Sequence, residues 1–146
     1  MSDTHFSLRN ELPAVNGRGR YLELNPAVMA AERDTCFALS VVYVGPEMNV
    51  DGQPLPLRVT VDESSVLMRA VAQKSKPVEA GESLTVALYS VSRSFLERLA
   101  SGDQVEVCLG NDEDPLVRPL ASANRDNVAR FLDFASQSAA SDHAAA

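Results

Sequence analysis

The sequence lacks tryptophan and contains only two histidines. Histidine is the usual proton shuttle of enzymes and the commonest metal ligand. His5 and His143 each lie near an end of the sequence, away from every apolar segment that could build a cleft around them. We therefore expect no metal site and no histidine-dependent catalysis.

The two cysteines are also too few for most cysteine-based architectures. Cys36 and Cys108 are far apart in sequence, which excludes a disulfide scaffold and a zinc finger. Both lie in apolar, strand-like runs, where burial raises the pKa of a thiol and makes it unreactive. We expect two unpaired thiols, and no Cys-His nucleophile, because the chain has no internal histidine to act as the base.

Positive charge is scarce as well. The chain has 13 Lys and Arg against 20 Asp and Glu, a net charge of −7. Such a chain repels nucleic acid and anionic lipid, so we expect neither as a partner.

Long apolar runs are absent. The longest, 37–44 and 84–88, are far shorter than the roughly 20 residues of a membrane helix, so no membrane span is expected. The first residues also lack the basic and apolar segments of a secretory signal. A cytoplasmic location is favoured, and a periplasmic one stays open for a trimmed mature form.

The remaining composition is that of an ordinary globular domain, with 45% hydrophobic and 23% charged residues in 146. Scattered polar residues, prolines and glycines predict an irregular lead-in over residues 1–19. A single α+β domain is expected over 20–136. Small and polar residues then predict a mobile tail over 137–146.

Hydrophobic periodicity predicts the elements of this domain. Alternation or β-branched runs predict strands at 20–24, 36–44, 57–62, 66–71, 83–91 and 104–109. The runs 66–71 and 83–91 are expected to pair across a solvated loop. Asn25-Pro26 predicts the start of a short helix over 27–33.

Two further helices are predicted towards the end of the chain. Ser94 and Glu97 match a capping box, and Gly102 should end that helix in a left-handed conformation. Asn124 is expected to cap a last helix whose apolar face contains Val128, Phe131 and Leu132. The predicted fold is therefore α+β, a mostly antiparallel sheet or half-barrel of five to seven strands with two or three short helices.

Candidate sites are few. Asp112-Glu113-Asp114 lacks the ligand spacing of a calcium loop and is interpreted as a solvated turn. No phosphate-binding loop, nucleophile elbow or dinucleotide fingerprint occurs, so no cofactor is expected. Arg9, Arg18 and Arg20 form a local basic cluster, with Gly19 between the last two, that could bind an anion or an acidic partner.

One segment is similar to a known family. The strand Ser83–Leu88, the pattern Phe95-Leu96-x-x-Leu99-x-x-Gly102, the strand Val105–Val107 and the helix after Asn124 follow one another in order. This order resembles the C-terminal part of the invasion-associated locus B-like proteins, which are small bacterial envelope proteins, over roughly residues 57–135. The resemblance implies a β-rich, protein-binding scaffold without a catalytic motif. The sequence departs from that family because residues 70–81 contain no cysteine.

Together these features predict a non-catalytic protein-binding or accessory module with a protein partner and an open oligomeric state. A small hydrolase or transferase using Asp, Glu and Arg is one alternative. A subunit of a bacterial secretion or envelope assembly, recruited through a sheet edge, is another. A deep pocket lined by two of Asp62, Glu63, Asp103 and Asp114 would favour the enzyme. An apolar surface patch or an unpaired edge strand would favour the binding functions.

Overall fold

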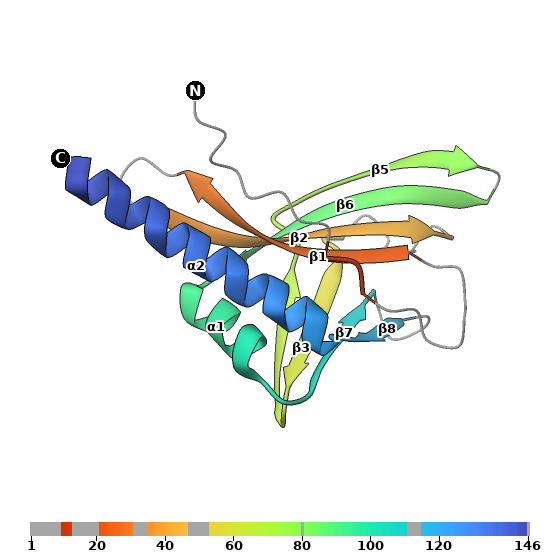
Figure 1. The fold of residues 1–146 in the computed structure, drawn as a ribbon. Helices are drawn as coiled ribbons and strands as arrows, with labels where there is room; N and C mark the ends of the chain where they lie inside the picture. Colours follow the sequence, from red (N-terminus) through yellow and green to blue (C-terminus); the bar gives the residue numbers. More distant parts are fainter. Residues whose placement is uncertain are drawn as a thin grey trace.

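The computed structural model describes residues 10–12, 21–30, 35–46, 53–79, 81–110 and 115–145. This part of the chain forms eight strands and two helices (Figure 1). The strands are β1 (Tyr21–Ala30), β2 (Thr35–Gly45), β3 (Pro56–Val61), β4 (Ser64–Arg69), β5 (Ala72–Glu79), β6 (Glu82–Val91), β7 (Val105–Leu109) and β8 (Leu116–Pro119). The helices are α1 (Arg93–Ser101) and α2 (Ser122–Ala145).

The strands form two separate four-stranded antiparallel sheets. We call them sheet I, with the order β1-β2-β6-β5, and sheet II, with the order β4-β3-β7-β8. The predicted α+β fold, with one sheet or half-barrel of five to seven strands, is therefore wrong. Hydrophobic alternation locates strands along the chain, but it does not say which strands share a sheet.

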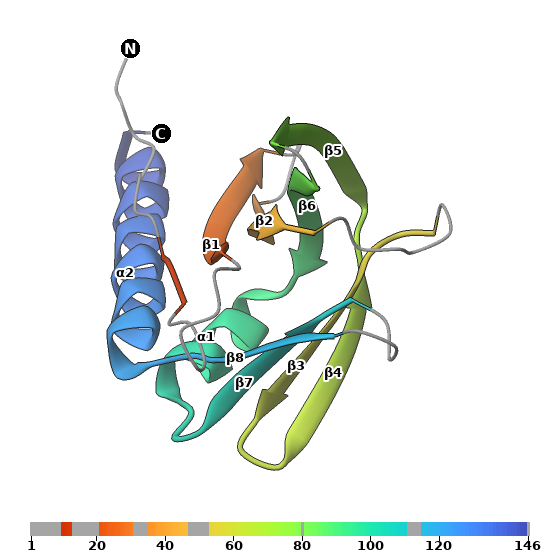
Figure 2. The same ribbon diagram turned by 90° about the vertical axis from the view of Figure 1, so that its right-hand side faces the viewer.

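The strand order identifies the type of sandwich. Lettered A, B, C, C′, D, E, F and G in chain order, the strands form an A-B-E-D sheet and a C′-C-F-G sheet. This is the order of an immunoglobulin-like sandwich. The strands of the two sheets cross steeply, and β4 runs into β5 as the chain passes from sheet II to sheet I (Figures 1 and 2).

The passage between sheets occurs at two residues. The N–H of Ala70 donates to the carbonyl of Leu55, next to β3 of sheet II. The following N–H, of Val71, donates to the carbonyl of Leu88 in β6 of sheet I. The N–H groups of two successive residues thus bond to different sheets. One extended segment therefore connects the two sheets at this corner of the sandwich.

The core lies between the sheets and extends to the helices. Period-2 alternation places Leu39, Val41 and Tyr43 of β2 on the inner side, and β3 and β7 contribute in the same way. The apolar faces of both helices enter the same core. Their buried residues are Phe95, Leu96 and Leu99 of α1 and Val128, Phe131 and Leu132 of α2. The predicted apolar face of the last helix, α2, is confirmed.

The helix ends differ from the prediction in detail. Ser92, two residues before the expected cap, accepts a hydrogen bond from the N–H of Phe95 at 3.1 Å. Gly102 ends α1 with φ −67° and ψ 149°, so its backbone is extended and not left-handed. Asn124 lies inside α2 and accepts from the N–H of Ala121 at 3.0 Å, in the manner of the third residue of a capping box.

Two segments form a different type of secondary structure from the one predicted. The chain continues as β1 through Asn25 and Pro26, because residues up to Ala30 find partners on β2, and no helix forms over the described residues 27–30. The expected loop over Gln73–Pro77 is part of β5, which pairs with β6. Residues 66–69 pair with β3 instead of β6. The secondary structure and pairing of these segments are determined by their cross-strand partners and not by the local preferences of their residues.

α2 continues to Ala145, so the backbone expected as a mobile tail is helical as far as residue 145. Neither this helix nor α1 is long and apolar enough to cross a membrane, and the finding concerns the described residues.

Candidate protein-binding surface

The outer face of sheet I carries aliphatic side chains at its centre. On β6 the inward residues are Ala87 and Tyr89, so the alternate residues face outwards. On β2 the inward residues are Val41 and Tyr43, with the same consequence. The five outward aliphatic residues, here called the aliphatic patch, are Val42, Val44, Leu84, Val86 and Leu88.

The aliphatic patch is continuous and separate from the core. Val42 pairs directly with Val86, and Val44 with Leu84, so their side chains are neighbours on one face. None of the five residues belongs to the core cluster. Val86 is 41% exposed, and the other four are half-buried. Single exposed apolar residues are ordinary on protein surfaces, whereas a contiguous apolar patch is a candidate interaction site.

Charges of opposite sign flank the patch on the two sides of the sheet. On the β5 side, Lys74 pairs with Val86, and on the β1 side, Glu23 pairs with Val42. Glu11 extends the sheet by a bridge to Glu23. One line across the sheet, here called the charged row, therefore reads Lys74, Val86, Val42, Glu23 and Glu11.

The ends of the charged row are accessible to solvent. Lys74 and Glu11 are exposed, and Lys76 is exposed beside Lys74, in register with Leu84 of the patch. Glu23 is only 7% exposed, and it accepts hydrogen bonds from the hydroxyl of Tyr21 and from the amide of Asn25. Its carboxylate is thus held in place within the face.

The acidic end of the charged row, formed by Glu23 and Glu11, is held in position by Asn10, a buried residue next to Glu11. Asn10 is fully buried, and its backbone carbonyl accepts from the N–H of Leu24 at 3.0 Å. Its side-chain oxygen accepts from the amides of Asn124 at 2.8 Å and Asn127 at 2.9 Å, both on α2. Residues 10–12 are thereby tied to both β1 and α2, which gives Glu11 a defined position at the side of sheet I.

The outer face of sheet II is different. One line across it reads Leu67, Arg58, Cys108 and Val117. Leu67 is 53% exposed, but the exposed Arg58 separates it from the other apolar residues of that line. Apolar side chains on this face are scattered, as on most protein surfaces.

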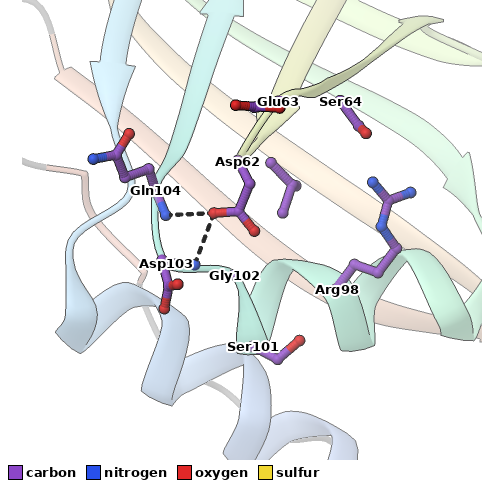
Figure 3. Close-up of a pocket in the computed structure, with 9 residues that line it drawn as sticks. Asp62, Glu63, Ser64, Arg98, Ser101, Gly102, Asp103 and Gln104 are labelled. Atoms are coloured by element: carbon purple, nitrogen blue, oxygen red, sulfur yellow. Dashed lines mark hydrogen bonds between the residues drawn. The ribbon is translucent and has the colours of Figure 1, made fainter.

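A shallow hollow of about 640 Å³ lies where the β3–β4 turn meets the end of α1 (Figure 3). Its lining residues are Val61, Asp62, Glu63, Ser64, Arg98, Ser101, Gly102, Asp103 and Gln104. Three of the four carboxylates that the sequence suggested for an enzyme pocket therefore border one hollow.

The Asp62 carboxylate at the centre of this hollow is used by the backbone. Asp62 has a φ of 55°, a conformation that Asp tolerates in tight turns. Its Oδ1 accepts from the N–H groups of Asp103 at 3.1 Å and Gln104 at 3.0 Å. In Figure 3, Glu63 and Asp103 lie on opposite sides of Asp62. Both bonds end on Oδ1, so this oxygen ties the β3–β4 turn to the backbone that follows α1.

Among the described residues, no cluster of three or more His, Cys, Asp and Glu side chains could hold a metal ion.

The predicted basic cluster cannot be located in this fold. Arg9, Arg18 and Arg20 lie outside the described residues, as do residues 112–114 of the acidic turn. The anion-binding hypothesis for the three arginines therefore remains a prediction.

Cys36 and Cys108 form no disulfide in this structure. They occupy β2 and β7, the strands equivalent to B and F, which antibody domains join by an inter-sheet disulfide. Here the inward neighbours are Phe37 on β2 and Val107 on β7, so both cysteines fall on outward positions of different sheets. Both are half-buried instead of fully buried.

Neither the aliphatic patch nor the two ends of the charged row were predicted from the sequence. The signal was present in residues 84–89, where apolar residues occupy both phases of the alternation. A strand that is apolar on both faces is covered on both sides, or it presents one apolar face to a partner. The positions of Lys74 and Glu11 beside the patch follow only from the pairing register of the strands.

Comparisons with known proteins leave the function open. No protein-family model matches the chain, and no curated protein matches it. A crystal structure of the human pre-T cell receptor is similar, with 14% identity over 69% of this chain and 94% of that chain, at a TM-score of 0.41. A likeness of this degree supports no statement about function, and the sandwich described above rests on the strand order alone.

Proposed function

We propose that this protein is a non-catalytic binding module that docks a protein onto the outer face of sheet I. The aliphatic patch carries the proposal. Five aliphatic side chains on two adjacent strands face away from the core and remain partly accessible. Covering apolar surface stabilises a complex by about 25 cal/mol per Å² before the costs of association are subtracted.

The alternative of a small enzyme has less support. The hollow beside α1 is its best candidate site, and there one oxygen of the Asp62 carboxylate, Oδ1, accepts hydrogen bonds from two backbone N–H groups. General acid–base catalysis needs a proton donor or acceptor positioned against the reacting group. The described lining residues offer only one cation, Arg98, and no nucleophile paired with a base.

The proposal is tested by site-specific photo-crosslinking. A photoreactive amino acid replaces Val86 in the full chain, which is expressed in its native cells and irradiated. The matched control carries the same amino acid at Leu67, an exposed aliphatic position on sheet II with no apolar patch around it.

We expect a discrete crosslinked protein from position 86 and not from position 67. The product should disappear when Leu88→Glu is added, because a charge in the patch cannot be desolvated without a partner charge. Equal products from positions 86 and 67, or none from either, would refute docking on sheet I.

A further inference from the structure

The order of charges in the charged row makes the face of sheet I complementary to itself. The row begins with a cation on β5, continues through two valines, and ends with two carboxylates beside β1. Turning a second copy over about an axis parallel to the strands reverses the order of the row. Its basic end then faces the acidic end of the first copy, and its valines face valines.

We propose that the molecule docked on the aliphatic patch is a second copy of this chain, related by a two-fold axis that runs along the strands between β2 and β6. This inference rests on the function proposed above, since it names the partner of the same face. Val86 of each copy packs against Val42 of the other. Lys74 of each copy lies over the acidic end formed by Glu23 and Glu11.

The strand geometry is consistent with such a pair. Neighbouring strands are about 4.8 Å apart, so the row spans about 19 Å from Lys74 to Glu11. An axis between β2 and β6 lies within the aliphatic patch, and strands of the two copies run nearly parallel, as in aligned sheet packing. Leu84 then meets Val44, the second apolar pair that the register provides.

The other two-fold arrangement is unfavourable. An axis across the strands would set β5 of one copy on β5 of the other. Lys74 and Lys76 would then face the same lysines of the partner, and the carboxylates would face carboxylates. Like charges placed opposite one another in an interface oppose association. The charges therefore select the axis along the strands.

The area of the proposed interface on sheet I predicts a weak dimer. Four strands and about six residues along each give a flat face of roughly 400 Å², about half of the 800 Å² that each partner buries in a standard interface. We expect reversible association with a dissociation constant in the micromolar to millimolar range. The charged contacts occur twice in the dimer, so the constant should also rise with salt.

Analytical ultracentrifugation of the purified full chain tests the proposal. Lys74→Glu and Glu11→Lys each turn two attractive contacts into repulsive ones, and each should raise the dissociation constant about tenfold or more. Mixed in equal amounts, the two variants form a heterodimer in which positions 74 and 11 carry opposite charges at both contacts, while the unchanged Glu23 opposes the reversed charge at position 74 in one of them. The mixture should therefore associate more tightly than either variant alone.

Two further variants control for unrelated effects. Arg58→Glu reverses a charge on the outer face of sheet II and should leave the association unchanged. Val86→Glu should abolish it. Thermal unfolding of every variant should match the unaltered chain, because all the altered residues are exposed.

The outcomes separate this inference from the proposed function. A chain that sediments as a monomer at millimolar concentration, or a mixture no tighter than its components, overturns the dimer. If position 86 nevertheless crosslinks to a different protein in cells, the binding function stands and the second copy is the wrong partner. If the chain is monomeric and position 86 captures nothing, both fail.

Discussion

Replacing Asn10 tests whether residues 10–12 are a structural part of the sandwich. The Asn10 amide donates to the carbonyls of Leu24 at 3.0 Å and Asn124 at 3.4 Å. Its oxygen accepts from Asn124 and Asn127. Asn10→Ala removes all four contacts, although the Asn124 amide keeps its bond to the carbonyl of Glu11 at 2.8 Å.

The expected loss follows from the groups that remain buried. The Leu24 carbonyl and the Asn127 amide each lose a partner, and an unsatisfied buried polar group costs about 1–3 kcal/mol. We expect Asn10→Ala to lower the free energy of unfolding by about 2–4 kcal/mol, measured by urea unfolding followed by circular dichroism. An unchanged urea midpoint would show that the segment is peripheral.

Asn10→Asp refines this test through pH. The substitution keeps the accepting oxygen but places a carboxylate oxygen against the Leu24 carbonyl, and it buries a negative charge. Burial should raise the pKa of Asp at this position above its unfolded value of about 3.9. The folded state then binds the proton more tightly, so stability is retained below about pH 4 and lost as pH rises. A variant equally stable at pH 4 and pH 7, relative to the unaltered chain, would contradict this reasoning.

Two further predictions concern the core. Burial raises the pKa of Tyr89 above its ordinary value of 10.0, so the unfolded chain should ionise first and stability should fall as pH rises above 10. Tyr89→Phe should reduce this fall in urea titrations at alkaline pH, at the expense of the bond to the Leu55 carbonyl. A Cβ at Gly102 would lie 2.7 Å from Cγ1 of Val61, so Gly102→Ala should cost about 1–2 kcal/mol. Adding Val61→Ala should recover part of that loss, and strictly additive effects in urea unfolding would argue against the contact.

The parts of the fold that the sequence predicted are those with a strong local period. The strand around Val59 alternates in a period of two, and the helix around Phe131 repeats every three to four residues. Each pattern specifies one buried face without reference to the rest of the chain. These elements could be predicted because the local preference and the tertiary packing agree.

The errors lie where the two disagree. Asn25-Pro26 is a good helix start, yet β1 continues through it, and the missing N–H of Pro26 is tolerated at the side of a sheet. The segment that forms β5 has the composition of a loop, because it contains Lys74 and Pro77. It is a strand because it pairs with β6. The aliphatic patch could not be predicted for the same reason. The neighbours of Val42 are determined by the pairing of strands that are far apart in the sequence.

The edge strand β5 has features that hinder association through this edge of sheet I. An open edge invites pairing with another strand, and proteins block it with lysine, proline and bulges. All three occur on β5, in Lys74 and Lys76, in Pro77, and in the register shift between Pro77 and Glu79. Strand addition at this edge is therefore hindered. The lysines that protect the edge belong to the rows that cross the patch, so the same charges that disfavour pairing at the edge favour an acidic surface lying over the face.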